Sequence, residues 1–175
     1  MKTNMAYGAI TLLMISCKTA TVPERRGTET GVSVLGSGSY YIIHANSGRA
    51  LTPNSPSEGQ NVFLRPFSHS GTQKWVLEVK GKNTSIHLCG YDALIFQPHP
   101  SVSDRPPVVS PDFMGGGSAQ FHIEPAGRPG LWRIRSAKLN NDALQGTQTS
   151  EEPGFGSITA NSSQQLWKLI PADCR

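Results

Sequence analysis

Two short segments of the chain place a carboxylate next to other polar or aromatic groups. Asp92 follows Tyr91 and Asp142 follows Asn141, and each aspartate stands two residues before the leucine of an Ala-Leu pair. Aspartate oxygens accept hydrogen bonds from neighbouring sugar hydroxyls, an asparagine amide donates, and a tyrosine ring offers a flat apolar face. Gln145 adds a further polar side chain beside the second pair. These residues are therefore candidates for carbohydrate binding, with Asn141, Asp142 and Gln145 first and Tyr91 and Asp92 second.

The same aspartates have a second interpretation. An aspartate in a tight turn commonly accepts hydrogen bonds from the backbone of that turn, and this role needs no ligand. The sequence leaves both interpretations of Asp92 and Asp142 open.

The sequence contains no pattern that is typical of a catalytic or metal site. Its five histidines form no His-x-x-x-His pair and have no Cys-x-x-Cys partner. The glycine run 115–117 is not followed by Lys-Ser or Lys-Thr, so it does not match a phosphate-binding loop. The acidic residues are few and dispersed, so no carboxylate pair for glycoside hydrolysis stands out. We expect a protein that is not an enzyme, with no cofactor and no metal.

Three aromatic residues mark an internal repeat. Trp75, Phe121 and Trp167 are spaced 46 residues apart, and each begins a short alternating apolar run. The first and the last are preceded two positions earlier by glutamine, Gln73 and Gln165. A fixed interval of this size indicates a repeated supersecondary unit, and alternation indicates half-buried strands. Further markers recur in each unit, namely the Ala-Leu pair and a β-branched run (Val62-Phe63-Leu64, Val108-Val109 and Ile158-Thr159).

Three units that end in Gln-x-Trp, or in a worn version of it, resemble the ricin-B-type β-trefoil. The resemblance covers roughly residues 38–171. It implies an all-β fold of twelve short strands in three repeats of about 46 residues. It also implies that Trp75, Phe121 and Trp167 are core residues around a pseudo-threefold axis, and that the first and last strands pair to close a barrel.

The resemblance further implies a glycan as the partner. In ricin-type sites an aspartate follows the Leu or Val of the second strand and binds two sugar hydroxyls, while an aromatic residue near the third strand stacks on the sugar. The matching aspartate positions here hold Thr52, Ile95 and Gln145, and the aromatic position of the first unit holds Arg65. We therefore expect a lectin-like, carbohydrate-binding module whose ricin-type sugar sites are degenerate.

Protease inhibition is the alternative function. The chain also resembles fungal β-trefoil inhibitors of serine and cysteine proteases, which present one rigid loop in a substrate-like form. A trypsin-like protease requires an exposed Lys or Arg that is not followed by proline. Lys138 and Arg49 meet this requirement and are the candidate inhibitor residues.

The chain divides into an N-terminal extension, residues 1–37, and a β-trefoil domain, residues 38–172. Residues 1–17 resemble a signal peptide and are too short to span a bilayer, and residues 18–37 have the composition of a flexible linker. We therefore expect a secreted protein without a membrane span, or a cytoplasmic one if residues 1–17 are not a signal. The sequence does not decide whether Cys89 and Cys174 pair or Cys89 is a free buried thiol.

The net charge of +4 gives little reason to expect nucleic acid as a partner. Residues 1–37 contain four basic and two acidic residues, so half of the excess lies outside the domain. The remaining basic residues are scattered, whereas nucleic-acid binding requires Lys and Arg gathered on one face.

Overall fold

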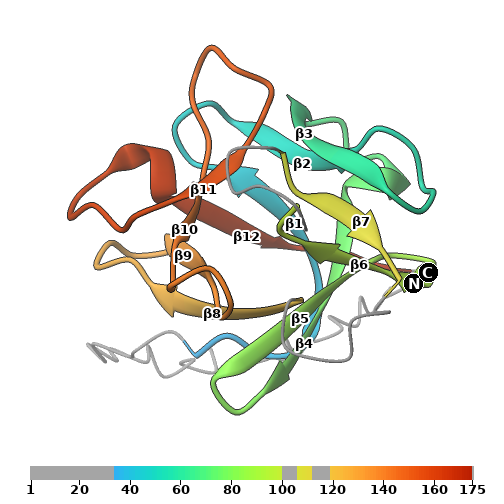
Figure 1. The fold of residues 1–175 in the computed structure, drawn as a ribbon, viewed down its shortest axis with the longest axis horizontal. Helices are drawn as coiled ribbons and strands as arrows, with labels where there is room; N and C mark the ends of the chain where they lie inside the picture. Colours follow the sequence, from blue (N-terminus) through green and yellow to red (C-terminus); the bar gives the residue numbers. More distant parts are fainter. Residues whose placement is uncertain (1–33, 100–105, 112–118, 175) are drawn as a thin grey trace, which may run out of the picture. The chain divides into compact units, whose positions relative to one another are not determined.

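The structure is a computed structural model that describes residues 34–99, 106–111 and 119–174 (Figure 1). These residues form twelve β-strands and two short 3-10 helices. The strands are β1 (Gly38–His44), β2 (Arg49–Pro53), β3 (Gln60–Pro66), β4 (Lys74–Lys80), β5 (Asn83–Leu88), β6 (Tyr91–Gln97), β7 (Val108–Ser110), β8 (Gln120–Pro125), β9 (Trp132–Ser136), β10 (Ala143–Gln145), β11 (Gly154–Gly156) and β12 (Trp167–Pro171). The 3-10 helices are η1 (Gly71–Gln73) and η2 (Ser163–Gln165). Strands β1–β4, β5–β8 and β9–β12 form units one, two and three.

Six of the strands form a closed barrel. Each pairs antiparallel with the next in the ring β1, β4, β5, β8, β9 and β12. The pairing of β1 with β12, from Tyr40 opposite Pro171 to His44 opposite Trp167, closes the ring, as expected from the sequence. Closure leaves the barrel strands without a free edge. The other six strands form three hairpins, β2–β3, β6–β7 and β10–β11, one from each unit.

The three repeat aromatics lie in a single hydrophobic core. Trp75, Phe121 and Trp167 are fully buried, and they share one cluster with the equally buried Ile42, Leu88 and Ile134. The prediction that the three repeat aromatics are core residues is confirmed. Their burial follows from the alternation of the barrel strands, in which every second side chain points inward.

The Gln-x-Trp motif joins the barrel to the hairpins through the same hydrogen bonds in units one and three. The indole of Trp75 donates to the carbonyl of Leu51 at 3.1 Å, and the indole of Trp167 donates to that of Leu144 at 2.9 Å. Both glutamines are buried. The Gln73 amide donates to the Pro66 carbonyl at 2.9 Å and accepts from the Ser68 backbone at 2.9 Å.

Gln165 acts in the same way on unit three. Its amide donates to the carbonyl of Ser157 at 2.8 Å and accepts from the backbone N–H of Thr159 at 3.1 Å. The motif therefore fixes the segment that follows the third strand in units one and three. Unit two has Ala119 and Phe121 at the corresponding positions, and neither side chain can make these bonds.

The prediction that Ile158-Thr159 marks a strand of unit three is wrong. Ile158-Thr159 lies after β11 rather than in a strand, and Ile158 is exposed. The third strand of unit three is Gly154–Gly156, and its central Phe155 is the residue that enters the core. The strand has only three residues, two of them glycines, so its sequence carries no alternating pattern.

Cys89 and Cys174 form a disulfide with a Cα–Cα distance of 5.8 Å. The bond joins the turn between β5 and β6 to the segment after β12. The expectation of a signal segment over residues 1–17, and most of the linker expected over 18–37, lies outside the described residues. Among the residues that are described, no helix is long and apolar enough to cross a membrane.

Candidate functional site

The three candidates of unit three do not line a common pocket. Asn141 is exposed in the β9–β10 loop with a left-handed backbone, φ +62°, and lines a pocket on the barrel wall with Arg135 and Trp132. Neither Asp142 nor Gln145 lines that pocket. Gln145 instead covers Gly156 of the paired strand, so closely that a Cβ at Gly156 would lie 2.8 Å from its amide nitrogen.

Asp142 holds its loop through its backbone. Its N–H donates to the carbonyl of Leu139, and its carbonyl accepts from the N–H of Ser136 at 2.9 Å. The half-buried Asp142 carboxylate makes no hydrogen bond or ion pair to another described residue. The backbone of Asp142, and not its carboxylate, therefore makes the hydrogen bonds that hold this turn. The carboxylate is available to a ligand.

The candidates of unit two lie together at the start of β6. Tyr91 is 45% exposed, and the neighbouring Asp92 is also exposed. The backbone carbonyl of Asp92 is 3.0 Å from Nδ1 of His87. Tyr91 and Asp92 thus form an exposed surface, and neither residue lines the pockets described below.

The two candidate inhibitor residues differ in setting. Lys138 is exposed in the turn after β9, where its N–H donates to Ser136 Oγ at 3.2 Å and its carbonyl accepts from Asn140 at 3.1 Å. Arg49 is not in a loop, because it is the first residue of β2 and pairs with Pro66. Its guanidinium reaches the carbonyl of Ser150 at 3.5 Å.

A concave polar site that sequence reasoning missed lies on the outward face of the β2–β3 hairpin. It is a pocket of about 240 Å³ near the hairpin tip. Its walls combine an aromatic ring, a guanidinium and three side-chain amides, supplied by Phe63, Arg65, Asn54, Gln60 and Asn61. The guanidinium of Arg65 lies over the Phe63 ring, 5.0 Å from the ring centroid.

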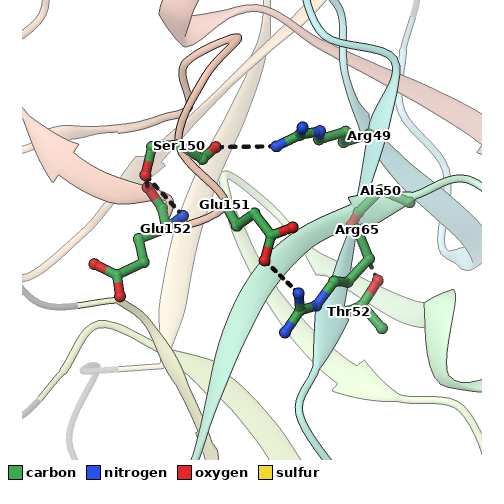
Figure 2. A network of polar contacts seen from close by, with 7 residues as sticks. All are labelled: Arg49, Ala50, Thr52, Arg65, Ser150, Glu151 and Glu152. Atoms are coloured by element: carbon green, nitrogen blue, oxygen red, sulfur yellow. Dashed lines mark hydrogen bonds and ion pairs between the residues drawn. The ribbon is translucent and has the colours of Figure 1, made fainter.

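Unit three adds a carboxylate to this face. Glu151, in the β10–β11 loop, forms an ion pair with Arg65, and its backbone carbonyl accepts from the N–H of Leu64 at 2.7 Å. Figure 2 shows the Glu151 carboxylate directed across the hairpin toward Arg65, near Thr52. A hydrogen bond from the Glu152 N–H to Ser150 Oγ, at 3.0 Å, stabilises the turn in this loop. We call the pocket residues, together with Thr52 and Glu151, the hairpin site.

The Arg65–Glu151 ion pair remains accessible. The two side chains are 40% and 47% exposed, so water screens their attraction and the pair contributes little to stability. Their charged atoms are therefore free to exchange water for a ligand. One residue hints at this site in the sequence, since Arg65 stands where the aromatic of a ricin-type site is expected. Glu151 lies 86 residues away in a loop, and no local pattern links the two.

Comparison with known proteins gives matches in structure alone, since no protein-family model and no curated protein sequence matches the chain. A designed threefold-symmetric protein, ThreeFoil, is 18% identical with a TM-score of 0.67, over 77% of this chain and 99% of that one. A ricin B-like lectin from Macrolepiota procera, solved in complex with lactose, is 15% identical with a TM-score of 0.62, over 80% and 99%. The chain has the β-trefoil fold. A mosquitocidal holotoxin also matches, at 17% identity and a TM-score of 0.71, although the match covers 80% of this chain and only 18% of the toxin.

These matches confirm the expected fold and the resemblance to ricin-B-type β-trefoils at the level of the fold. A fold hosts many functions, so the function must be argued from the site. The second-strand aspartate of the ricin-type pattern is absent here, with Thr52 in unit one and Gln145 in unit three. In unit one the hairpin site nevertheless contains a carboxylate, which comes from a different unit.

Proposed function

We propose that this protein binds a carbohydrate at the hairpin site and that it acts as a non-enzymatic, lectin-like module. The observation that carries the proposal is a small pocket on the β2–β3 hairpin that is lined by Phe63 and Arg65, with Glu151 paired to Arg65 beside it. A sugar presents hydroxyls that both donate and accept, together with apolar C–H faces. A pocket that recognises it needs an acceptor, a donor and an apolar surface in close proximity.

Each group has a definite role in this proposal. The Glu151 carboxylate accepts from sugar hydroxyls, in place of the aspartate that Thr52 replaces. The Arg65 guanidinium donates to ring or hydroxyl oxygens, and its fork of N–H groups suits two neighbouring oxygens. Phe63 supplies the apolar surface, and the amides of Asn54 and Gln60, 3.5 Å apart, add donors and acceptors at the pocket mouth.

The residues selected from the sequence form the second set of candidate contacts. The Asp142 carboxylate and the neighbouring Asn141 amide supply an acceptor and a donor in unit three. Tyr91 and Asp92 supply a ring and a carboxylate in unit two. We rank both below the hairpin site, because Gln145 lies against Gly156 of β11 and because Tyr91 and Asp92 are exposed and line neither 240 Å³ pocket.

Carbohydrate binding is favoured over protease inhibition by the conformation of the β9–β10 loop. A substrate-like inhibitor presents an extended loop, whereas the backbone at Lys138 is folded into a hydrogen-bonded turn. Arg49 lies in a strand and contacts the β10–β11 loop. Secretion is part of the proposal, and the Cys89–Cys174 disulfide supports it, because such bonds persist in oxidising compartments.

The proposal is tested by applying the full chain to a glycan array and to a panel of serine and cysteine proteases. The best soluble sugar is then titrated calorimetrically against Glu151→Gln, which preserves the side-chain shape and removes the charge. We expect a loss of roughly 10- to 150-fold in affinity, corresponding to about 1.5–3 kcal/mol for a charged hydrogen bond.

Glu152→Gln is the matched control, since Glu152 is the exposed neighbour whose backbone alone contacts Ser150. It should bind the sugar as the parent chain does. Equal affinity of the parent and Glu151→Gln would exclude the hairpin site. Potent inhibition of a protease together with an empty glycan array would replace the proposed function with the alternative.

A further inference from the structure

A second polar pocket of about 240 Å³ lies on the barrel wall, where β4, β5 and β8 run side by side. Its polar lining includes Glu78 of β4, Asn83, Ser85 and His87 of β5, and Gln120 of β8. Ile95, which is 8% exposed, adds an apolar surface. We call this the wall pocket. It shares no residue with the hairpin site.

The hydrogen bonds of His87 and Ser85 determine which of their atoms donate and which accept. Nδ1 of His87 is 3.0 Å from the carbonyl of Asp92, so this nitrogen carries the proton of the neutral ring. Nε2 is then an acceptor, and the hydroxyl of Ser85, 3.0 Å away, donates to it. The lone pairs of Ser85 Oγ therefore remain to accept from a ligand. The carbonyl of Asp92 orients this arrangement from outside the pocket.

Two further side chains of the wall pocket, Asn83 and Glu78, contact protein groups and retain donors or acceptors for a ligand. The Oδ1 atom of Asn83 accepts from Nε2 of His122 at 3.1 Å, which leaves the two N–H groups of the Asn83 amide as donors. Glu78 lies opposite Ser85 in the sheet, and its carboxylate is 3.4 Å from the Lys80 ammonium. The carboxylate is 48% exposed and retains acceptor capacity. The Lys80 ammonium offsets the charge of the Glu78 carboxylate.

We propose that the wall pocket is a second sugar site, which binds a neutral sugar through two adjacent hydroxyls. This inference rests on the proposed carbohydrate-binding function. Glu78 and Ser85 accept from the hydroxyls, Asn83 and Gln120 donate to their oxygens, and Ile95 contacts the apolar face of the ring. The groups lie on paired barrel strands, which hold them at fixed spacing before a ligand arrives.

Two sites on one rigid domain would change how the protein binds surfaces. The hairpin site is near the β2–β3 tip and the wall pocket is on β4, β5 and β8; Figure 1 shows the β2–β3 hairpin in the upper part of the view and β4 and β5 in the lower part. One chain would then hold two glycans at once, and the affinity for a glycan-covered surface would exceed that of either site by about 10²–10⁴-fold.

The test uses the full chain with the hairpin site disabled by Arg65→Met and Glu151→Gln. Backbone amide NMR signals are followed during titration with methyl β-galactoside, methyl α-mannoside and N-acetylglucosamine. We expect saturable shifts of the Ser85, His87 and Gln120 signals with at least one of these sugars. Adding Glu78→Gln should weaken this binding by at least tenfold, whereas adding Glu152→Gln should leave it unchanged.

Unchanged Ser85, His87 and Gln120 signals with all three sugars would overturn the inference, as would binding that Glu78→Gln leaves intact. The remaining amide signals report whether each variant is folded. The parent chain separates the two proposals. Shifts at Gln60 and Phe63 without shifts at the wall pocket would refute the second site and keep the first. Shifts at neither place, together with an empty glycan array, would refute both.

Discussion

Breaking the Cys89–Cys174 disulfide should lower the free energy of unfolding by several kcal/mol. The cysteines are 85 residues apart, so the bond closes a loop that spans about half of the chain. In the chain-entropy model, closing such a loop removes about 15 cal/mol/K from the unfolded ensemble, or about 4.5 kcal/mol at 25 °C. This value is an upper estimate, because real unfolded chains are more compact than the model assumes.

The native state should survive the loss of the bond. The segment after β12 is also held by the Lys74 ammonium, which donates to the Asp173 carbonyl at 2.7 Å, and by the Ala172 N–H, which donates to Ser39 at 2.8 Å. The loss should therefore come from the unfolded state. With a urea m-value of about 2 kcal/mol/M, the unfolding midpoint should fall by about 1–2 M.

The measurement is urea unfolding of a Cys17→Ser chain with and without Cys89→Ala and Cys174→Ala, followed by tryptophan fluorescence. Cys17→Ser alone serves as the control for the loss of a thiol. Reduction of the Cys17→Ser chain with a phosphine should reproduce the double substitution. A change below 1 kcal/mol in both experiments would show that the cross-link does not constrain the unfolded chain as argued.

Three further outcomes follow from buried groups. Trp167→Phe should cost about 1–3 kcal/mol in thermal or urea unfolding, because it leaves the buried Leu144 carbonyl without its donor; an unchanged stability would contradict the role of the indole. Burial lowers the pKa of His44 from 6.5, so the unfolded chain binds a proton that the folded chain does not. Stability should thus be full above pH 6.5 and fall as the pH decreases toward the folded pKa, and His44→Gln should flatten that part of the pH profile. Gly146→Ala would place a Cβ 2.7 Å from Leu64 Cδ1, so it should cost about 1–3 kcal/mol, and a neutral effect would show that the site relaxes freely.

The fold was predictable from the sequence because its signal is repeated. Trp75, Phe121 and Trp167 recur at a constant interval, and the physical requirement for a large apolar side chain at the barrel core keeps them recognisable. The third strand of unit three was not predictable, since a Gly-Phe-Gly strand carries one inward residue and no alternation. The Cys89–Cys174 bond was left open because cysteine spacing alone does not place two side chains within reach.

The hairpin site was harder to predict because it is assembled from distant parts of the chain. Arg65 and Glu151 meet only after β3 and the β10–β11 loop have docked, and the contact that brings them together is a backbone hydrogen bond from Leu64. Nearly every residue has the same backbone donor and acceptor. A contact made by backbone groups therefore cannot be predicted from the residue types that make it. Sequence reasoning instead selected aspartates beside a repeat marker, which the structure distributes over separate surfaces.

The unequal distribution of the Gln-x-Trp bonds sets an order in which the domain should open. In units one and three, a buried glutamine amide and a tryptophan indole form hydrogen bonds that connect a hairpin to the barrel. Unit two has Ala119 and Phe121 at these positions and lacks both groups. Local opening requires the least free energy where the fewest bonds hold a segment. The amide protons of β6 and β7 should therefore exchange with deuterated solvent before those of β2 and β10. The disulfide at Cys89 anchors the turn that leads into β6 to the segment after β12. Unit two is thus linked by a covalent bond at one end, where its sister units are linked by the hydrogen bonds of their Gln-x-Trp motifs.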